Sequence, residues 1–502
     1  MISGSDIKEL FRTGEYKLII AADGEPVTSH VRGGKVVSEV PAGGVAVALD
    51  PIARMTNALY ISRAKNPDER LDLDKNAKRL VGNSGGSYTL KRLFFQEKDF
   101  NDYYYGFSNQ TLWPLCHVAF EEPKFNEEWY KGYKKINQQF ANAIKEEIKG
   151  KTIVWIQDYQ LSLVPLLLDK PKDTIIAMFW HIPWPTWEVF RILPNKKDIL
   201  MSLLSCDFLA FHRGYQARNF LNTVERELET RIDDETQKVY YKNNVTLVKS
   251  LPLGIDIDVV KSMVHQEVEG ETVLSKKIRD ILGIEESKPH PLDWYFQKYK
   301  VIFGVDRLDY TKGLKHRLLA LDRFFEKNQQ YIGKVVYLGI IAPSRELIGS
   351  YARLRKEVQV LANGINAKYG NKEWKPIHLI HDIFKREDIM NFYRQADVCV
   401  VTPLDDGMNL VSKEFVVASS VTSDPGMLVL SQFAGSSIDL QQALIVNPYN
   451  IDEVAVAIKR GLEMEKAEKI ERIKQMMSQL EEKNVYEWAY NNLKGALQAK
   501  KG

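Results

Sequence analysis

Two basic side chains follow an apolar run in the segment VDRLDYTKGLKHR (305–317). Arg307 and Lys312 stand five residues apart, directly after KVIFGV (300–305). Ligands of open parallel sheets bind beyond the carboxyl ends of the strands. A guanidinium offers a planar fork and an ammonium a point charge, so the pair suits a diphosphate. A solvated charge cluster is the alternative interpretation.

A second candidate site lies in TPLDDGMNLVSKEFVVAS (402–419), where a strand runs into a glycine-containing turn and then a helix. The amides of residues 407–409 would open that helix, and helix N-termini bind anions and hydroxyl groups. Asp406 would hold sugar hydroxyls, and Glu414 would hold a ribose. The alternative is an aspartate that caps the helix and a glutamate on its surface.

Two polar residues follow strongly apolar runs. His181 comes after TIIAMFW (174–180), and Pro183 and Pro185 stiffen the loop that would present it. Lone histidines beside strands are more often structural than catalytic. Asp158 ends a buried strand, where a charge is costly unless it is paired or functional. A helix cap is the rival interpretation for Asp158.

Two further segments suit a sugar ligand. DYYYGFSNQTLWP (102–114) is dense in aromatic rings, which stack on the apolar face of a pyranose while tyrosine hydroxyls donate hydrogen bonds. An aromatic corner of the core is the alternative. Gly43 and Gly44, in VPAGGVAVALDP (40–51), would let the backbone approach a ligand closely, although a lone glycine pair is a weak signal.

The elements that must position these residues are strands alternating with helices. Short apolar runs that predict buried strands lie at 17–22, 152–157, 174–180, 207–212, 245–253, 300–305, 334–341, 378–381, 397–403, 427–430 and 443–448. Amphipathic segments of helix length lie between many of them, such as 128–150. This alternation implies parallel sheets with helices on both faces. The sequence therefore predicts an α/β fold of two doubly wound domains.

The domain boundaries follow from the same pattern, since the strand series pauses near residue 253 and resumes near 300. We predict domains at 1–253 and 254–480, and a helical tail at 481–502 that packs against the body or crosses back to the N-terminal domain. The passage 257–298 reads as helical and charged.

Composition excludes several classes of protein. The chain of 502 residues is 44% hydrophobic and 27% charged with a net charge of +3, so no global field favours nucleic acid or a membrane surface. Its three cysteines, Cys116, Cys206 and Cys399, lie far apart and predict buried apolar positions, not a disulfide framework or zinc site. Neither a signal peptide nor a long apolar run is visible, so we expect a cytoplasmic protein.

No common nucleotide-binding or hydrolase motif occurs: a P-loop, G-x-S-x-G, H-E-x-x-H and G-x-G-x-x-G are all missing from the sequence. Asp256 and Asp258 form a D-x-D pair, which some metal-using glycosyltransferases employ. Because the pair begins the passage between the two domains, we expect no metal there.

Taken in order, these segments resemble the trehalose-6-phosphate synthase family, retaining glycosyltransferases of the GT-B fold. VDRLDYTKG, DGMNLVSKEF and SQFAGSSIDLQQALIVNPYN (431–450) carry the resemblance, which extends from about residue 18 to 460. It implies two Rossmann-like domains facing across a cleft, with the acceptor on 1–253 and the nucleotide sugar on 254–480. It further implies transfer of glucose from UDP-, ADP- or GDP-glucose to glucose 6-phosphate, without a metal or cofactor. The resemblance leaves open whether the protein forms a homo-oligomer.

The resemblance also implies roles by position. The catalytic residues would be His181, Arg307, Lys312 and Asp406. The donor would be bound by Gly43, Gly44, Arg307, Lys312, Asp406, Gly407, Met408, Asn409, Leu410, Val411 and Glu414. The acceptor would be bound by Tyr104, Trp113, Asp158 and Arg345, with Arg345 on its phosphate.

Several positions depart from the family pattern. Gly24 stands where the family has an arginine that binds the acceptor phosphate, and Asp405 replaces another arginine. We therefore expect weak binding of glucose 6-phosphate or another acceptor, unless a cation such as Arg32 or Lys35 fills the place. A glucosylglycerol-phosphate synthase-like enzyme and a non-catalytic sugar-nucleotide-binding homologue stay open. A phosphorylase-like enzyme would need a lysine for a covalent cofactor, and the motifs argue against it.

Overall fold

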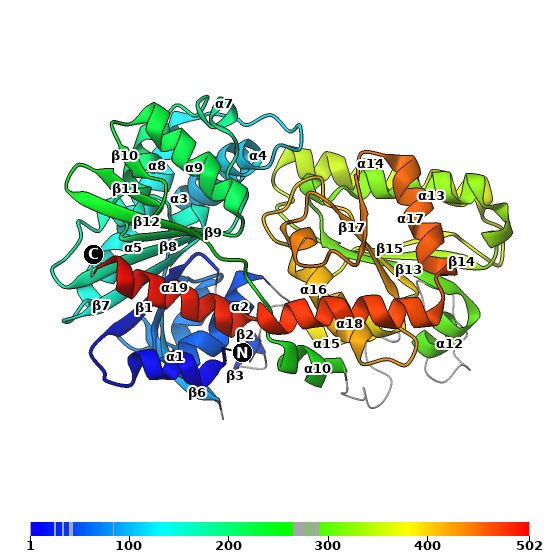
Figure 1. Cartoon of the computed structure of the whole chain (residues 1–502), viewed down its shortest axis with the longest axis horizontal. Helices are drawn as coiled ribbons and strands as arrows, with labels where there is room; N and C mark the ends of the chain where they lie inside the picture. Colours follow the sequence, from blue (N-terminus) through cyan, green and yellow to red (C-terminus); the bar gives the residue numbers. More distant parts are fainter. Residues whose placement is uncertain are drawn as a thin grey trace. The chain divides into compact units, whose positions relative to one another are not determined.

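The computed structural model describes residues 2–24, 27–32, 35–39, 44–83, 85–264, 279, 282 and 291–500. The chain divides into two compact units, which are considered separately (Figure 1). Unit 1 comprises Met1–Gly254 and Lys483–Gly502, and unit 2 comprises Ile255–Glu482. Most of the predicted helical passage 257–298 lies outside the described residues.

Unit 1 is built on a mixed sheet. Its strands are β1 (Lys17–Ala22), β4 (Leu59–Arg63), β5 (Lys78–Asn83), β6 (Gly86–Leu93), β7 (Thr152–Gln157), β8 (Thr174–Trp180), β9 (Phe208–Phe211), β10 (Arg231–Asp233), β11 (Lys238–Tyr241) and β12 (Asn244–Ser250). They are ordered β10-β11-β12-β9-β8-β7-β1-β4-β6-β5. The strands from β12 to β6 in this order run parallel, and the outer ones are antiparallel. The direction of winding reverses between β1 and β7, which is where such sheets bind ligands.

The strands at the centre of unit 1 are buried, and its helix α5 is capped by a side chain. Every residue of β7 and β8 is buried, as expected for parallel strands covered on both faces. Helix α5 (Glu127–Glu147) contacts β1 and β4, and Asn126 caps its start by accepting from the amides of Glu128 and Trp129. Other helices of the unit are α1 (Gly4–Phe11), α2 (Val45–Met55), α9 (Gly214–Glu227) and α19 (Val485–Ala499).

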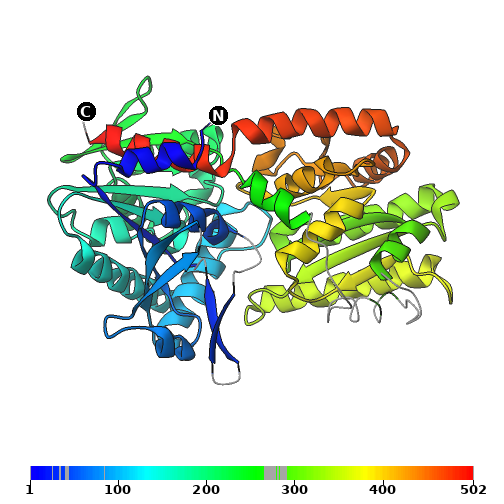
Figure 2. The same ribbon diagram turned by 90° about the horizontal axis from the view of Figure 1, so that it is seen from below.

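The two ends of the chain meet within unit 1. Helix α19 contacts α1, α2, β8, β9 and β12, and the blue and red terminal helices lie side by side in Figure 2. Asn484 caps α19, and its Nδ2 donates to the carbonyl of Ile2 at 3.3 Å. Trp488 is buried against Trp155 and Phe179, with ring centroids 5.0 and 5.3 Å apart. The last helix is therefore part of the core of this unit.

Unit 2 holds a wholly parallel sheet. Its strands are β13 (Lys300–Arg307), β14 (Val335–Ala342), β15 (Ile377–Ile380), β16 (Val398–Val401), β17 (Met427–Ser431) and β18 (Leu444–Val446). The order is β15-β14-β13-β16-β17-β18, so the winding reverses between β13 and β16. This reversal makes the carboxyl ends of β13 and β16 the expected ligand site.

Helices form a layer on each side of the unit 2 sheet, as Figure 1 shows. One layer is α13 (Leu314–Lys327), α14 (Gly349–Tyr369) and α17 (Ile451–Glu463). The other is α10 (Ile257–Val264), α15 (Arg386–Gln395), α16 (Leu410–Ser420) and α18 (Lys466–Glu482). The short helix α12 (Pro291–Lys298) precedes β13. The predicted α/β class with two doubly wound parallel sheets is confirmed.

Some elements had no sequence prediction. Among these are the hairpin of β2 (Thr28–Arg32) and β3 (Lys35–Glu39), the strands β4, β5, β6, β10 and β11, and a π-helical stretch at Asn101–Leu112. Cys116, Cys206 and Cys399 are all buried, as predicted. Within the described residues, no helix is both long enough and apolar enough to span a membrane.

Candidate active site

The loops after β13 and β16 pack backbone against backbone at the reversal point of unit 2. Gly313, which ends the turn after β13, has φ of +66°, and a Cβ there would lie 2.1 Å from the carbonyl oxygen of Thr402. Only glycine allows both this conformation and this approach. The amide of Leu404 donates to the carbonyl of Thr311 at 2.7 Å. The two loops therefore form one rigid platform.

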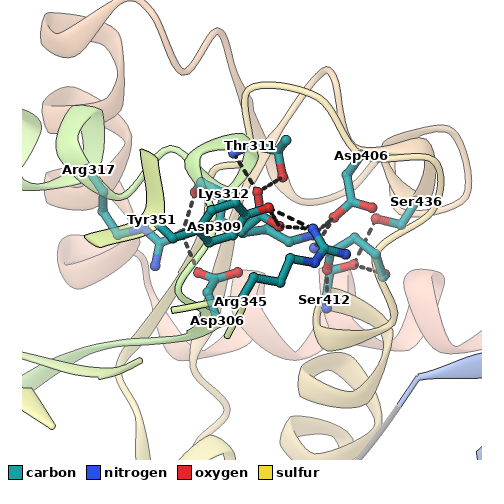
Figure 3. Close-up of polar contacts among 11 residues, drawn as sticks. Asp306, Asp309, Thr311, Lys312, Arg317, Arg345, Tyr351, Asp406, Ser412 and Ser436 are labelled. Atoms are coloured by element: carbon teal, nitrogen blue, oxygen red, sulfur yellow. Dashed lines mark hydrogen bonds and ion pairs between the residues drawn. The ribbon is translucent and has the colours of Figure 1, made fainter. Parts of the chain in front are cut away.

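Lys312, Asp406 and Asn409 meet on this platform. Lys312 Nζ lies 2.5 Å from Asp406 Oδ2 (Figure 3). Asn409 Nδ2 donates to the same oxygen at 3.1 Å. The side chains of Lys312 and Asp406 are 12% and 14% exposed, so the pair is partly shielded from water. Arg307, the last residue of β13, is exposed. A cation and a carboxylate thus lie at the carboxyl end of the sheet, beside its reversal point, where ligands of such sheets bind.

Arg317, in a buried ion pair with Asp306, links the two loops. Arg317 on α13 lies 2.7 Å from Asp306 Oδ2, and the two side chains are 1% and 3% exposed. Arg317 also donates to Thr402 Oγ1 at 3.1 Å and to the carbonyl of Lys312 at 3.4 Å. One guanidinium therefore contacts the strand, the loop that carries Lys312 and the start of the loop that carries Asp406.

Asp309 anchors the first loop from the other side. Its Oδ1 accepts from the amide and hydroxyl of Thr311 at 3.1 Å each, and its Oδ2 lies 3.2 Å from Arg345 and from the Tyr351 hydroxyl. Burial would raise the pKa of Asp309, but the charges of Arg345, Arg307 and Lys312 outweigh it and lower the pKa. Arg345 is itself only 4% exposed. Its predicted contact with an acceptor phosphate stays a prediction.

The turn before α16 is shaped by close backbone contacts. Asn409, with φ of +83°, caps α16 by accepting from the amide of Ser412 at 3.0 Å. The amide of Gly435 donates to the carbonyl of Asp406 at 2.9 Å, and that of Ser436 donates to the carbonyl of Met408 at 2.7 Å. Of the other predicted donor-site residues, Gly407 lies in the turn, and Leu410 and Val411 begin the helix.

Glu414 has a partner that the sequence did not suggest. Arg386, the first residue of α15, donates to Glu414 Oε1 from Nε at 2.9 Å and from Nη2 at 2.7 Å. Burial raises the pKa of Glu414, and Arg386 only partly offsets this effect. The predicted contact of Glu414 with a ribose is untested.

In unit 1, Asp158 and His181 directly follow the neighbouring strands β7 and β8. Asp158 has φ of +72°, and its Oδ1 accepts from the amides of Tyr159 at 2.9 Å and His181 at 3.0 Å. Such strain in a residue other than glycine concentrates at functional sites. The Nε2 of His181 lies 2.9 Å from Gln157 Oε1, and burial lowers the pKa of His181 to about 3. His181 is therefore a neutral imidazole at physiological pH.

The other residues predicted in unit 1 lie on different elements. Tyr104 lies in the π-helical stretch, half-buried, with its ring stacked on Phe100 at 5.2 Å. Trp113 follows and is 6% exposed. Gly44, with φ of +93°, precedes α2, and Gly43 lies outside the described residues.

The residues that the sequence interpretation missed are the partners that hold others in place. They are Asp306, Asp309, Arg317, Tyr351 and Arg386. Some of these stand inside the segment 305–317, whose charge was noted, but their buried pairing arises only in the fold. Asp256 accepts from the amide of Val259 at 3.1 Å and so caps α10. Among the residues that the structure describes, no cluster of three or more His, Cys, Asp or Glu is arranged to hold a metal.

The fold consists of two doubly wound units, and charged residues lie at the reversal point of the sheet in unit 2. The profile of glycosyltransferase family 20 matches residues 17–498, so the chain belongs to this family and is a glycosyltransferase. This confirms the family and enzyme class predicted from the motifs.

Three relatives show the range of similarity. The UDP-forming alpha,alpha-trehalose-phosphate synthase of Pichia angusta is 37% identical over 78% of this chain and 80% of its own. The corresponding synthase of Candida albicans is 32% identical over 89% of this chain and 90% of its own. Synthase A of Dictyostelium discoideum is 31% identical over 95% of this chain, which spans only 62% of that longer relative.

Solved structures agree with these relatives. A trehalose-6-phosphate protein from E. coli bound with UDP-2-fluoro glucose has a TM-score of 0.81 and 30% identity, with 94% of this chain and 97% of that chain covered. A UDP-forming alpha,alpha-trehalose-phosphate synthase from Burkholderia xenovorans, in complex with glucose-6-phosphate, has a TM-score of 0.82 and 28% identity. The covered shares there are 96% and 100%.

Proposed function

We propose that this chain transfers glucose from UDP-glucose to glucose 6-phosphate with retained configuration, giving UDP and trehalose 6-phosphate. The observation that carries the proposal is the cluster of Lys312, Asp406 and Asn409 at the reversal point of the unit 2 sheet. The relatives are named as UDP-forming synthases, which favours UDP-glucose as the donor.

In this proposal Lys312 and Arg307 bind the donor diphosphate. An ammonium has three N–H donors, so Lys312 keeps donors for phosphate oxygens while it stays bound to Asp406. Negative charge grows on the diphosphate as its bond to glucose breaks, and fixed cations stabilise that charge most at the transition state. Asp406 accepts from hydroxyls of the glucose, and the amides of residues 407–409 surround it.

The chemical step needs a proton acceptor. The bond between C1 of glucose and the diphosphate oxygen breaks, and a bond forms from C1 to the acceptor hydroxyl oxygen on the same face. The hydroxyl proton passes to the departing diphosphate. His181 is neutral, with a pKa lowered to about 3 by burial, so it orients the sugar and does not act as an acid. The enzyme then contributes positioning and charge stabilisation.

Product analysis tests the proposal. The protein is incubated with glucose 6-phosphate and UDP-, ADP- or GDP-glucose, and the products are identified by NMR. We expect UDP and a disaccharide phosphate with both anomeric centres α. Hydrolysis of the donor without transfer would refute it. Binding of UDP-glucose without turnover would also refute it and would favour the non-catalytic alternative. Transfer only to another phosphorylated acceptor would refute the acceptor assignment and keep the enzyme class.

A further inference from the structure

Arg63 is a cation at the ligand-binding edge of unit 1 that the proposed mechanism has not used. It is the last residue of β4, and β4 runs parallel to β1 with Ile61 beside Ala21. Two residues further on, the register places Arg63 opposite Asp23. Both lie at the carboxyl ends of strands beside the reversal point between β1 and β7, where ligands of such sheets bind.

The Arg63 side chain is fixed by its neighbours. Its Nε lies 3.0 and 3.1 Å from the two oxygens of Asp23, which also accepts from the Tyr103 hydroxyl at 3.0 Å. The guanidinium carbon lies 4.8 Å from the centroid of the Phe100 ring and 5.3 Å from that of Tyr104. A guanidinium held by a carboxylate and by two aromatic rings is preorganised and loses little freedom when it binds.

The outer edge of this guanidinium is open. In the described part of the chain, Nη1 and Nη2 of Arg63 donate to no acceptor, and the side chain is 14% exposed. Arg92 on the next strand differs, because its guanidinium is bound to Glu69, the Ser62 hydroxyl and the carbonyl of Val27 and is 1% exposed. Asp23 engages only Nε, so the two Nη groups of Arg63 remain as a planar fork that fits a phosphate.

We propose that Arg63 binds the phosphate of the phosphorylated acceptor and gives this chain its preference for that acceptor over the free sugar. This inference rests on the proposed function. Tyr104, which contacts Arg63, is one of the residues predicted to bind the acceptor. Gly24 lies next to Asp23 and contributes no cation, so the charge comes from the adjacent strand.

Kinetics of Arg63→Met test the assignment. A charge-assisted hydrogen bond contributes enough that its loss lowers affinity about 10- to 100-fold. We expect the KM for glucose 6-phosphate to rise by that factor while the KM for UDP-glucose stays within twofold. The preference for glucose 6-phosphate over glucose, measured as a ratio of kcat/KM, should fall by the same factor. Arg70→Met is the matched control, because exposed Arg70 also covers a ring, that of Phe94 at 4.3 Å.

A second pair of variants separates a lost phosphate contact from a disturbed fold. Gly24→Arg in the Arg63→Met background should recover much of the affinity, since a Cβ at Gly24 would meet only Ala46, at 4.0 Å. If Arg63→Met does not fold, Arg63→Lys carries the test, and it should raise the KM for glucose 6-phosphate without lowering kcat. An unchanged KM in the folded variants overturns the inference. Wild-type protein that does not use glucose 6-phosphate overturns the proposed function instead.

Discussion

Replacing Arg317 by methionine removes the guanidinium that joins the two loops of the unit 2 site. Arg317 and Asp306 are 1% and 3% exposed and lie 2.7 Å apart. Loss of one partner leaves a buried charge unpaired, which typically costs about 3–5 kcal/mol. The change also removes the hydrogen bonds to Thr402 and to the carbonyl of Lys312. We expect both the stability of unit 2 and the kcat/KM for UDP-glucose to fall.

The destabilisation should depend on pH. Burial raises the pKa of Asp306, and the charges of Arg317 and Lys312 oppose that rise. Without Arg317 the pKa rises further, so folded Asp306 holds a proton that the unfolded chain has lost. Stability of Arg317→Met should therefore fall as pH rises above the usual aspartate value of about 3.9. The loss relative to wild type should be smaller at pH 5 than at pH 8.

Urea unfolding at both pH values measures this effect. Asp306→Asn together with Arg317→Met should recover part of the stability, because no buried charge is left, but not the activity, because the loops stay unjoined. Arg323→Met on the same helix is the control, since its ion pairs are exposed and worth about 0–1 kcal/mol. An Arg317→Met protein as stable as the Arg323 variant, or a loss independent of pH, would refute the reasoning.

Three further predictions have defined outcomes. Gly313→Ala places an alanine in the left-handed conformation, which costs about 1–2 kcal/mol, and presses its Cβ against the carbonyl of Thr402. The melting temperature and kcat/KM should therefore both fall. Unchanged kinetics would contradict a rigid platform. Burial lowers the pKa of His181 to about 3, below its unfolded value of about 6.5, so NMR at pH 5 should show a neutral ring. Because the unfolded chain then binds a proton that the folded chain does not, stability should fall as the pH falls from about 6.5 to about 3. An imidazolium at pH 5 would be the contrary result. Asp158→Asn keeps an acceptor for the amides of Tyr159 and His181 and should fold normally. Asp158→Ala removes that acceptor, so its free energy of unfolding in urea should be lower by about 1–3 kcal/mol. Equal stability of the two variants would count against this role.

The sequence predicted the strands that are buried along their whole length, and the strands β4, β6, β10 and β11, which it missed, are partly exposed. Runs such as 152–157 and 174–180 are continuously apolar because parallel strands are covered by helices on each side. Strand β4 is shorter and ends in Arg63, so its pattern does not stand out. The π-helical stretch at Asn101–Leu112 was noticed only as an aromatic segment, because its hydrogen-bond spacing has no simple sequence signature.

The candidate site was predictable in its charged residues and unpredictable in their partners. Lys312 and Asp406 stand in conspicuous segments after apolar runs, and the structure brings them together. Arg317 of helix α13 pairs with Asp306 of strand β13, which stands eleven residues earlier in the chain. Arg386 reaches Glu414 from another helix. Pairings of this kind depend on how elements pack, which a single sequence does not record.

The most direct test of the account compares two lysines that stand three residues apart. Lys312 faces the proposed diphosphate site, whereas Lys315 pairs with Glu357 at 2.7 Å and is 44% exposed. Steady-state kinetics with UDP-glucose as the varied substrate should show that Lys312→Ala lowers kcat/KM by a hundredfold or more, or about 3 kcal/mol. Lys315→Ala should stay within about twofold of wild type, as expected for an exposed pair. Near-normal kcat/KM in a folded Lys312→Ala protein would contradict the assignment of the donor site.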